Sequence, residues 1–311
     1  MTDLRIRQVL LDDTGAISRL FQAKIPIWQR LNARGQVESL PHDQLTIYER
    51  WSHGGAWMSI ETAAIHLSRL LRGAGLALVG EADGEVIAYA ELYPGNEPAP
   101  FNHHLHLAHL VTAVDDAEVF DAMLRYGIEL ARSTDSGQLT LSLPGNDPSD
   151  SPYNRYQLQR LATVQRYNLS ARTGQGFYKV NDHSVMPQIE DWQMPVGRIE
   201  SARQHLELLW NRVWEIIPEI AARKIHRLSI TASGHEAYLC CQTQLFNPRS
   251  IDVYLWSPRP LSPPLLTAIR DWSHRQNYRT LALVVTPETA KLLGTEAEAD
   301  PYLRHIYAVQ P

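Results

Sequence analysis

The sequence predicts an α/β protein made of two similar units in tandem, each a mixed central sheet flanked by helices. The chain has 311 residues, about twice the usual domain length of roughly 150 residues. Strand-like and helix-like segments alternate up to residue 180, and the same order begins again, in shorter form, after residue 195. Periodicity is lost between them. We therefore expect a first domain at 1–182, a linker at 183–194 and a shorter second domain at 195–311.

In the first unit, each expected element rests on its periodicity and its end signals. Alternation at 4–10 predicts a strand, and Asp12-Asp13-Thr14 offers caps for the next helix. Ser59 predicts the start of a helix over 60–71. The Asp83-Gly84 pair predicts a tight hairpin turn. The later elements expected in this unit are strands at 76–81, 85–93 and 104–113, a helix at 118–133, a strand at 138–143, a helix at 156–166 and a strand near 177–180.

The second unit shows the same kinds of signal. Ser201 and Gln204 have the spacing of a capping box, and Ser262 followed by Pro263 favours a helix start. Ser233-Gly234 predicts a turn between strands. The elements expected here are a strand at 195–200, a helix from 202 to Pro218, strands at 227–231, 236–246 and 250–256, a helix at 263–274, a strand at 280–285, a short helix from 287 and a last strand at 302–309.

Composition excludes several classes of protein. With 29 basic and 34 acidic residues, the net charge of −5 predicts no binding to nucleic acid or to an anionic membrane. The apolar runs are far shorter than the ~20 residues of a membrane span, and the N-terminus lacks a signal-peptide pattern, so we expect a cytoplasmic protein. The only cysteines, Cys240 and Cys241, are adjacent, which excludes a disulfide framework and a cysteine zinc cluster. The GxSxG, P-loop and GxGxxG motifs are also absent.

The order of elements and parts of the sequence resemble the GNAT superfamily of N-acetyltransferases. Residues 4–9 followed by Asp12-Asp13 resemble the start of such a domain, and residues 78–93 are similar to the paired central strands of many members. Residues 48–62 also resemble a segment of GNAT-like proteins. The resemblance implies two GNAT-like domains and, as co-substrate, acetyl-CoA or another acyl-CoA without a metal ion. It implies that the acceptor is an amine of a small molecule or a peptide, and that the two domains pair within the chain.

The resemblance also implies where the cofactor lies. The CoA phosphates would rest on backbone N–H groups at the start of the helix after the fourth strand, where unsatisfied donors and a partial positive charge suit pyrophosphate. Leu110, Val111 and Thr112, just before this helix, would contact the cofactor. The first unit has residues 115–120 at this position, with three acidic side chains, no glycine and no basic residue. Carboxylates there cap the helix and are poor neighbours for phosphate.

The corresponding loop of the second unit, residues 257–262, departs from the family pattern in another way. Arg259 is a candidate phosphate partner, but Pro260 stands at a glycine position and has no N–H. Pro263 and Pro264 remove two further donors from the first helical turn. Both loops therefore differ from the family motif, and the sequence leaves open which unit, if either, binds CoA.

Glu91 is the predicted catalytic base. Acyl transfer to an amine needs a group that takes a proton from the nitrogen. Glu91 lies on the strand 85–93 and shares a face with Tyr89 and Tyr93 by the period of two. This pattern predicts a carboxylate in an acceptor pocket, with Tyr89 and Tyr93 in contact with the substrate. The alternative is the solvated face of an antiparallel sheet.

His104 and His106 are predicted to share a face and to contact the acceptor, with His103 and His109 on the opposite face. Two imidazoles on one face could also bind a metal or include a general base, but a third metal ligand at diagnostic spacing is missing. The other interpretation is a His-rich strand at the surface or between the domains. The resemblance also implies an acid that protonates the departing thiolate, at the position of Tyr153, with Tyr156 as a competing candidate.

The sequence therefore supports two hypotheses. The first is a tandem GNAT-like acyltransferase that transfers an acyl group, most simply acetyl, from CoA to an amine. The second is an inactive GNAT-fold protein that binds or interacts after losing the pyrophosphate loop.

Overall fold

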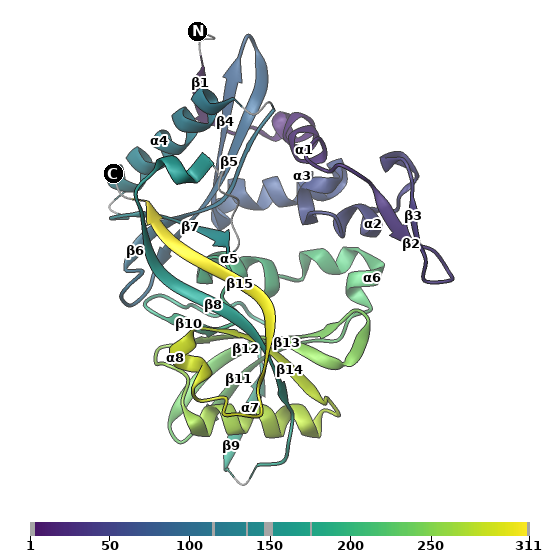
Figure 1. The fold of residues 1–311 in the computed structure, drawn as a ribbon, viewed down its shortest axis with the longest axis vertical. Coiled ribbons are helices and arrows are strands. Elements are labelled where there is room, and N and C mark those ends of the chain that lie inside the picture. The colour runs from purple at the N-terminus through teal and green to yellow at the C-terminus, as the bar shows by residue number, and fades with distance from the viewer. Residues whose placement is uncertain (1–3, 114–115, 135, 146–151, 175, 310–311) are drawn as a thin grey trace.

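The protein is described from a computed structural model, which covers residues 4–309 apart from 114–115, 135, 146–151 and 175. The described strands of the main sheet follow the order β1-β4-β5-β6-β7-β15-β8-β14-β13-β12-β11-β9, and β10 pairs with β13. In Figure 1 the strands β1 to β7 lie in the upper half and β11 to β14 in the lower half. The predicted class, two tandem units of mixed sheet flanked by helices, is confirmed.

The first unit has an antiparallel sheet that ends in a parallel pair, β6 and β7. The β4–β5 hairpin turns through Asp83 and Gly84, both with positive φ (51° and 79°), which confirms the predicted tight turn. The strands of this unit are β1 (Arg5–Gln8), β4 (Leu76–Ala82), β5 (Glu85–Asn96), β6 (His103–Thr112) and β7 (Leu139–Pro144).

Helices cover both faces of the first sheet. Buried side chains of α1 (Thr14–Gln22) and α3 (Ile60–Arg69) pack on the face that carries Tyr89, and α4 (Ala117–Ser133) packs on the opposite face. Ser59 accepts a hydrogen bond from the Thr62 N–H, which confirms it as the cap of α3. Between these elements lie α2 (Ile47–Trp51) and a small hairpin of β2 (Gln29–Leu31) and β3 (Val37–Ser39) that projects from the body in Figure 1.

The second unit repeats this plan, with β13 and β14 as its parallel pair. Ser262 accepts a hydrogen bond from the Leu265 N–H and caps α7, as predicted. No helix in the described ranges of the chain is long and apolar enough to cross a membrane. β9 (Tyr178–Asp182), from the end of the predicted first domain, joins the sheet of this unit. The unit's own elements are β10 (Gln193–Val196), α5 (Ala202–Leu209), α6 (Pro218–Ala221), β11 (Ile225–Ala232), β12 (His235–Gln244), β13 (Asn247–Ser257), α7 (Pro263–Arg275), β14 (Thr280–Val285) and α8 (Pro287–Ala290).

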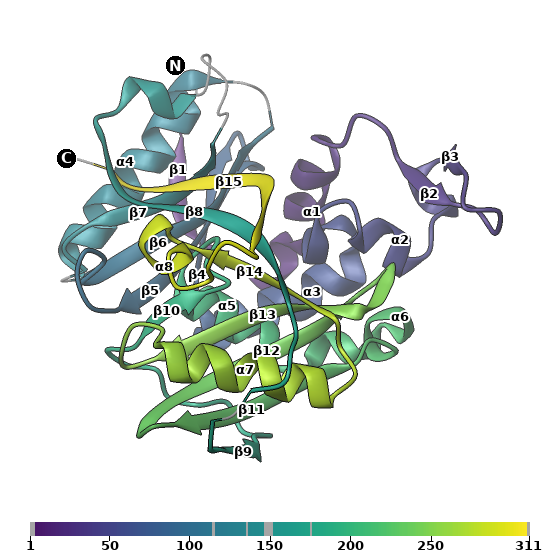
Figure 2. The same ribbon diagram turned by 60° about the horizontal axis from the view of Figure 1, so that its bottom comes forward.

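Two long strands join the units. β8 (Leu158–Ser170) and β15 (Glu298–Val309) run side by side from one half of the molecule to the other, as Figures 1 and 2 show. The end of β15, residues 304–309, pairs with β7 of the first unit. The end of β8, residues 165–170, pairs with β14 of the second unit. Each predicted unit therefore contributes a strand to the sheet of the other.

The helix predicted at 156–166 is wrong, because this segment begins β8. Leu158 and Leu161 have a helical spacing of three, but β15 and β14 offer hydrogen-bonding edges along the whole of 158–170. Long-range pairing thus overrides the local pattern, as is common for strands. The strand predicted near 177–180 exists as β9, but it pairs with β11 of the second unit. The division at 183–194 stays a prediction.

Candidate active site

In the first unit, β6 and β7 diverge and leave a V-shaped gap between them, which we call the first wedge. The two strands pair only from Leu105 to Leu107, although β6 continues to Thr112 and β7 to Pro144. Backbone groups alternate in direction along a strand. Since the Ala113 N–H donates to the Ile87 carbonyl of β5 at 2.7 Å, Leu110 directs its backbone groups to the other side, into the wedge. No described strand pairs with Leu110 on that side.

A β-bulge marks the point where the wedge begins. Glu91 lies opposite His109, but the next residue, Leu92, lies opposite Leu107, so Ala108 is an extra residue in β6. An extra residue reverses the alternation beyond it. The expectation that His109 lies on the face opposite His104 and His106 is therefore wrong: paired residues share a face, and His109 shares that of Glu91.

Glu91 is held by four hydrogen bonds inside the first unit. Its Oε1 accepts from His66 Nε2 at 3.0 Å and from the Tyr93 hydroxyl at 2.7 Å. Its Oε2 accepts from Trp57 Nε1 at 3.1 Å and from the Tyr89 hydroxyl at 2.9 Å. Glu91 is 1% exposed, so the alternative of a solvated face is wrong. Both tyrosines share its face, as predicted, and both are buried.

The electrostatics of this cluster keep Glu91 ionised. Burial by itself would raise the pKa of the carboxyl, but the charge and hydrogen bond of His66, with further contributions from His109 and Tyr93, hold the pKa well below its usual range. Burial and the adjacent Glu91 charge raise the pKa of Tyr89 and of Tyr93, which stay protonated donors. With each oxygen already accepting two hydrogen bonds, the carboxylate has little capacity to take a proton from a substrate.

Sequence reasoning missed Trp57 and His66. Trp57 lies in a 3-10 turn, Gly55–Met58, and stacks on Phe21 with ring centroids 5.4 Å apart. His66 lies on the buried face of α3 beside Ala63 and Leu67. The helical spacing of these three residues was a signal that His66 points inward, but nothing local indicated Glu91 as its partner.

Tyr153 and Glu91 lie on opposite faces of the sheet. Tyr153 packs beside the core under α4, and its ring meets the edge of Phe120 at a centroid distance of 5.1 Å. The competing Tyr156 donates its hydroxyl to Asp121 Oδ1 at 2.8 Å, and burial, with Asp121, raises its pKa to about 12. The structure therefore does not bring the two predicted catalytic side chains into contact.

The start of α4 is occupied by its own carboxylate. Asp116 Oδ1 accepts from the N–H groups of Glu118 at 2.8 Å and of Val119 at 3.4 Å. Two of the donors that a phosphate would use are thus already taken, as the sequence indicated. Asp115, another of the three acidic residues of this loop, lies outside the described residues. Of the predicted cofactor contacts, Leu110 and Val111 are half-buried and Thr112 is buried.

The second unit has a similar wedge, but the chain fills it. β13 pairs with β14 only as far as Val253 and Leu283. Beyond that point β10 lies against β13, with Val196 opposite Leu255, and the Gly197 N–H donates to the Val284 carbonyl at 2.7 Å. Gly197 has a φ of +88°, and a Cβ there would lie 2.8 Å from the Val253 carbonyl oxygen. Only glycine allows the backbone to pass this close.

The predicted phosphate partner of the second unit, Arg259, is exposed beside this filled wedge. Its backbone N–H donates to Ser257 Oγ at 3.2 Å. The same hydroxyl lies 2.7 Å from His235 Nε2, and His235 Nδ1 lies 3.0 Å from Ser262 Oγ. The loop is therefore held by Ser257 and Ser262 together with His235 of β12.

His104 and His106 lie at the contact between the units, which agrees with the second interpretation given to the His-rich strand. His106 Nε2 lies 2.8 Å from Glu200 Oε2, and Glu200 also pairs with Arg304 at 3.1 Å. His104 is buried 3.8 Å from Glu97, and burial lowers its pKa to about 3, so the ring is neutral at pH 7. Within the described ranges, no group of three or more His, Cys, Asp or Glu side chains could hold a metal ion.

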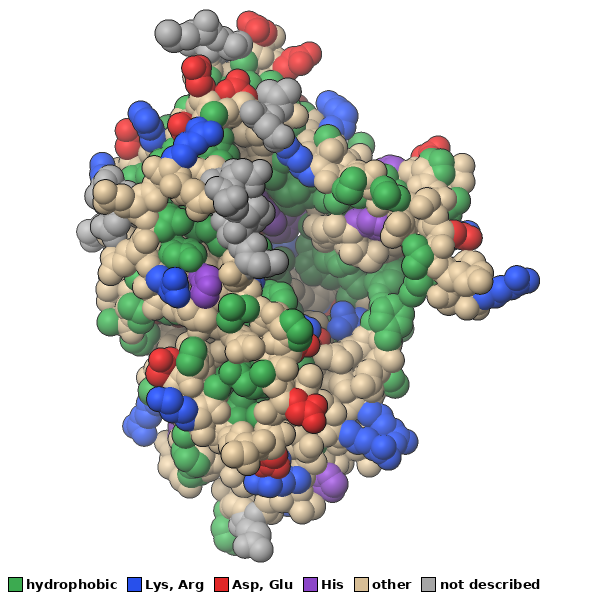
Figure 3. Space-filling model, viewed as in Figure 1, with side chains coloured by type: hydrophobic (Ala, Val, Ile, Leu, Met, Phe, Trp, Pro, Cys, Tyr) green, Lys and Arg blue, Asp and Glu red, His purple; other side chains and the backbone are tan. Residues whose placement is uncertain are grey.

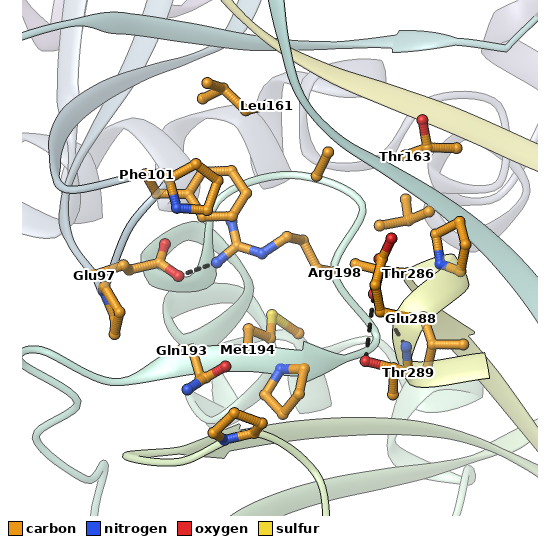
Figure 4. A pocket seen from close by; sticks show the side chains of 18 of the residues that line it. Glu97, Phe101, Leu161, Thr163, Gln193, Met194, Arg198, Thr286, Glu288 and Thr289 are labelled. Atoms are coloured by element: carbon orange, nitrogen blue, oxygen red, sulfur yellow. Dashed lines mark hydrogen bonds and ion pairs between the residues drawn. The ribbon is translucent and has the colours of Figure 1, made fainter. Parts of the chain in front are cut away.

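A cavity of about 420 Å³ lies between the units and borders β10. Figure 4 shows Arg198 reaching across it to Glu97, with the Phe101 ring against the guanidinium at 4.1 Å. Burial raises the pKa of Glu97, although Arg198 opposes this effect. Thr286, Glu288 and Thr289 line the cavity on the side away from Glu97. The cavity has the volume of a small-molecule site, and the ion pair across it connects the segment after β10 to the first unit.

Comparison with solved structures identifies the fold. A GCN5-related N-acetyltransferase from Anabaena variabilis superposes with a TM-score of 0.58 at 8% identity, over 98% of this chain and 72% of that one. A GCN5-related N-acetyltransferase from Kribbella flavida gives a TM-score of 0.58 at 12% identity, over 99% and 71%. No protein-family model and no curated protein matches the sequence. Since the alignments span both units, the chain has the GNAT fold in tandem.

Proposed function

We propose that the protein is an acyl-CoA-dependent N-acyltransferase whose donor binds in the first wedge, while the second unit binds none. One observation carries the proposal: the strand edge at Leu110 has no described strand beside it, whereas the matching edge at Leu255 is taken by Val196. A free strand edge binds extended chains through its backbone groups. The amide-bearing arm of an acyl-CoA is such a chain. Leu110, Val111 and Thr112 are its proposed contacts.

The acceptor amine would enter from the side of α1 and α3. Figure 3 shows a hollow there, walled by hydrophobic side chains and with a histidine visible inside. In the reaction the amine nitrogen forms a bond to the acyl carbon, the carbon–sulfur bond breaks, and one proton leaves the nitrogen. We assign Glu91 the role of a fixed negative charge in this site, because its four hydrogen bonds are already made. Tyr153 stays the proposed proton donor to the thiolate.

The second unit has a structural role in this proposal. β10 and Gly197 occupy the wedge that a donor would need, and β8 and β15 exchange strands between the two sheets. The second unit therefore completes the first sheet and supplies partners such as Glu200 to its side chains. The alternative, that neither unit binds a donor and the protein is inactive, is tested by the binding experiment below.

Calorimetric titration with acetyl-CoA tests this proposal. We expect one binding site per chain. Asp116→Ser keeps a good capping side chain but removes a negative charge beside the phosphates. This variant should bind acetyl-CoA about two- to tenfold more tightly, since one unit charge at about 4 Å contributes roughly 1 kcal/mol when fully screened by water.

Arg259→Ala is the matched variant in the second unit and should leave the affinity unchanged. Two results would contradict the proposal. If millimolar acetyl-CoA gives no heat of binding and no shift in the melting temperature, the protein does not bind the donor and the inactive GNAT-fold alternative holds. Weaker binding in Arg259→Ala alone would move the donor to the second unit.

A further inference from the structure

We propose that His109 is the catalytic residue that accepts the proton of the attacking amine, with Glu91 as a fixed negative charge on the same face of the sheet. This inference rests on the proposed function and names the proton acceptor of the same site. It begins with the bulge at Ala108, which turns His109 onto the face of Glu91 at the mouth of the first wedge.

Glu91 itself is unsuited to this step. It is 1% exposed, and each of its oxygens accepts two hydrogen bonds from buried donors. A proton could enter only by breaking one of these bonds. A catalytic base must lie within hydrogen-bond reach of the proton it takes. His109 meets this condition better because it is half-buried, and neither of its ring nitrogens has a hydrogen-bond partner in the described part of the chain.

The neighbours of His109 fix its place. Phe21 of α1 meets the imidazole edge-on, with ring centroids 5.3 Å apart. Leu110, the next residue, carries the proposed backbone contact to the donor. The thioester arm and the imidazole would therefore lie along the same few residues of β6, as proximity of reacting groups requires.

The charge of Glu91 complements this role. His109 is one of the groups whose charge holds the pKa of Glu91 down, so the two attract when His109 is protonated. The imidazolium formed in the reaction would thus face a carboxylate that cannot take its proton. The proton taken from the amine passes from His109 to solvent, while Tyr153 protonates the departing thiolate and regains a proton from solvent, which leaves an amide, a free thiol and a neutral imidazole.

The other histidines of this strand do not offer the same arrangement. His104 Nδ1 bonds to the Asn102 carbonyl, and His106 bonds through both nitrogens to Thr140 and Glu200. His103 is exposed at the far end of β6. It serves as the matched control.

The test measures thiol release from acetyl-CoA, with and without a panel of primary amines, in the wild type and in His109→Gln and His103→Gln. His109→Gln should keep the acetyl-CoA affinity within about twofold but lower the rate by 10²–10⁴-fold, the usual contribution of general base catalysis. The fall of the wild-type rate at acidic pH should disappear in this variant. His103→Gln should match the wild type in all three readouts.

A measurement without turnover separates the two proposals. The imidazole proton resonances of His109, assigned by comparison with His109→Gln, should shift when acetyl-CoA binds. If acetyl-CoA binds and these resonances do not move, or the rate and its pH dependence survive in His109→Gln, the assignment of His109 is wrong. If acetyl-CoA does not bind the wild type at all, the proposed function fails first.

Discussion

Replacing Glu91 by alanine is expected to lower the free energy of unfolding by about 3–5 kcal/mol, the usual cost of removing one partner of a buried charged pair. The change leaves four donors, those of Trp57, His66, Tyr89 and Tyr93, buried without an acceptor. Each buried polar group left unsatisfied costs about 1–3 kcal/mol. Urea unfolding followed by circular dichroism measures the loss.

Two comparison variants sharpen this experiment. Glu91→Gln keeps the shape and one acceptor oxygen and should be destabilised less than Glu91→Ala. Glu85→Ala changes an exposed carboxylate at the start of the same strand and should stay within about 0.5 kcal/mol of the wild type. A loss below about 1 kcal/mol in Glu91→Ala would contradict the hydrogen-bonded cluster.

The same variants predict a dependence on pH. The folded-state pKa of Glu91 lies below the unfolded value of about 4.3. Its charge therefore stabilises the fold fully above that value and progressively less as the pH falls toward the folded pKa. The stability difference between the wild type and Glu91→Gln should shrink as the pH is lowered from about 6 to 3. Other depressed carboxyls, such as Asp13, are present in both proteins and cancel.

Ending the chain at Pro301 is the second change with a large expected effect. It removes residues 304–309 of β15, which lie between β7 and β8, and with them the buried side chains of Ile306, Ala308 and Val309. The edges of both neighbouring strands then lose their hydrogen-bonding partners. We expect the first unit to lose cooperative unfolding, although the residues removed belong to the second unit in sequence.

Thermal unfolding by circular dichroism and calorimetry checks this prediction. The control is Ile306→Ala, which keeps the strand and should lose only about 2–5 kcal/mol. A truncated chain with the wild-type midpoint and a single transition would show that the exchanged strand does not stabilise the first sheet.

Local chemistry explains which features of the fold were predictable. The turn at Asp83-Gly84 and the caps Ser59 and Ser262 are decided by their own few residues, and all three were confirmed. The segment 158–170 depends on distant strands at both edges, so its local helical spacing misled the prediction. No local sequence signal marks the exchange of strands between the units, because the exchange depends on which distant strands pair with β8 and β15.

The candidate site divides in the same way. The common face of Tyr89, Glu91 and Tyr93 follows from the period of two and was predictable. The position of His109 was not, because one extra residue at Ala108 reverses the alternation and no sequence pattern marks the bulge. The strand β10 begins in the last two residues of the predicted linker and overlaps the strand predicted at 195–200 only at 195–196. Its place beside β13 depends on the close passage of Gly197. The proposed donor and proton-acceptor sites therefore lie where strand pairing is irregular, at the Ala108 bulge and in the first wedge.

Hydrogen exchange with and without acetyl-CoA tests the central claim most directly, because it shows which wedge takes the donor. We predict slower amide exchange in β6 around Leu110 when acetyl-CoA is present. Exchange in β13 around Leu255, already paired with Val196, should not change. Protection confined to β13 and residues 257–262, or no protection anywhere at saturating acetyl-CoA, would contradict the account.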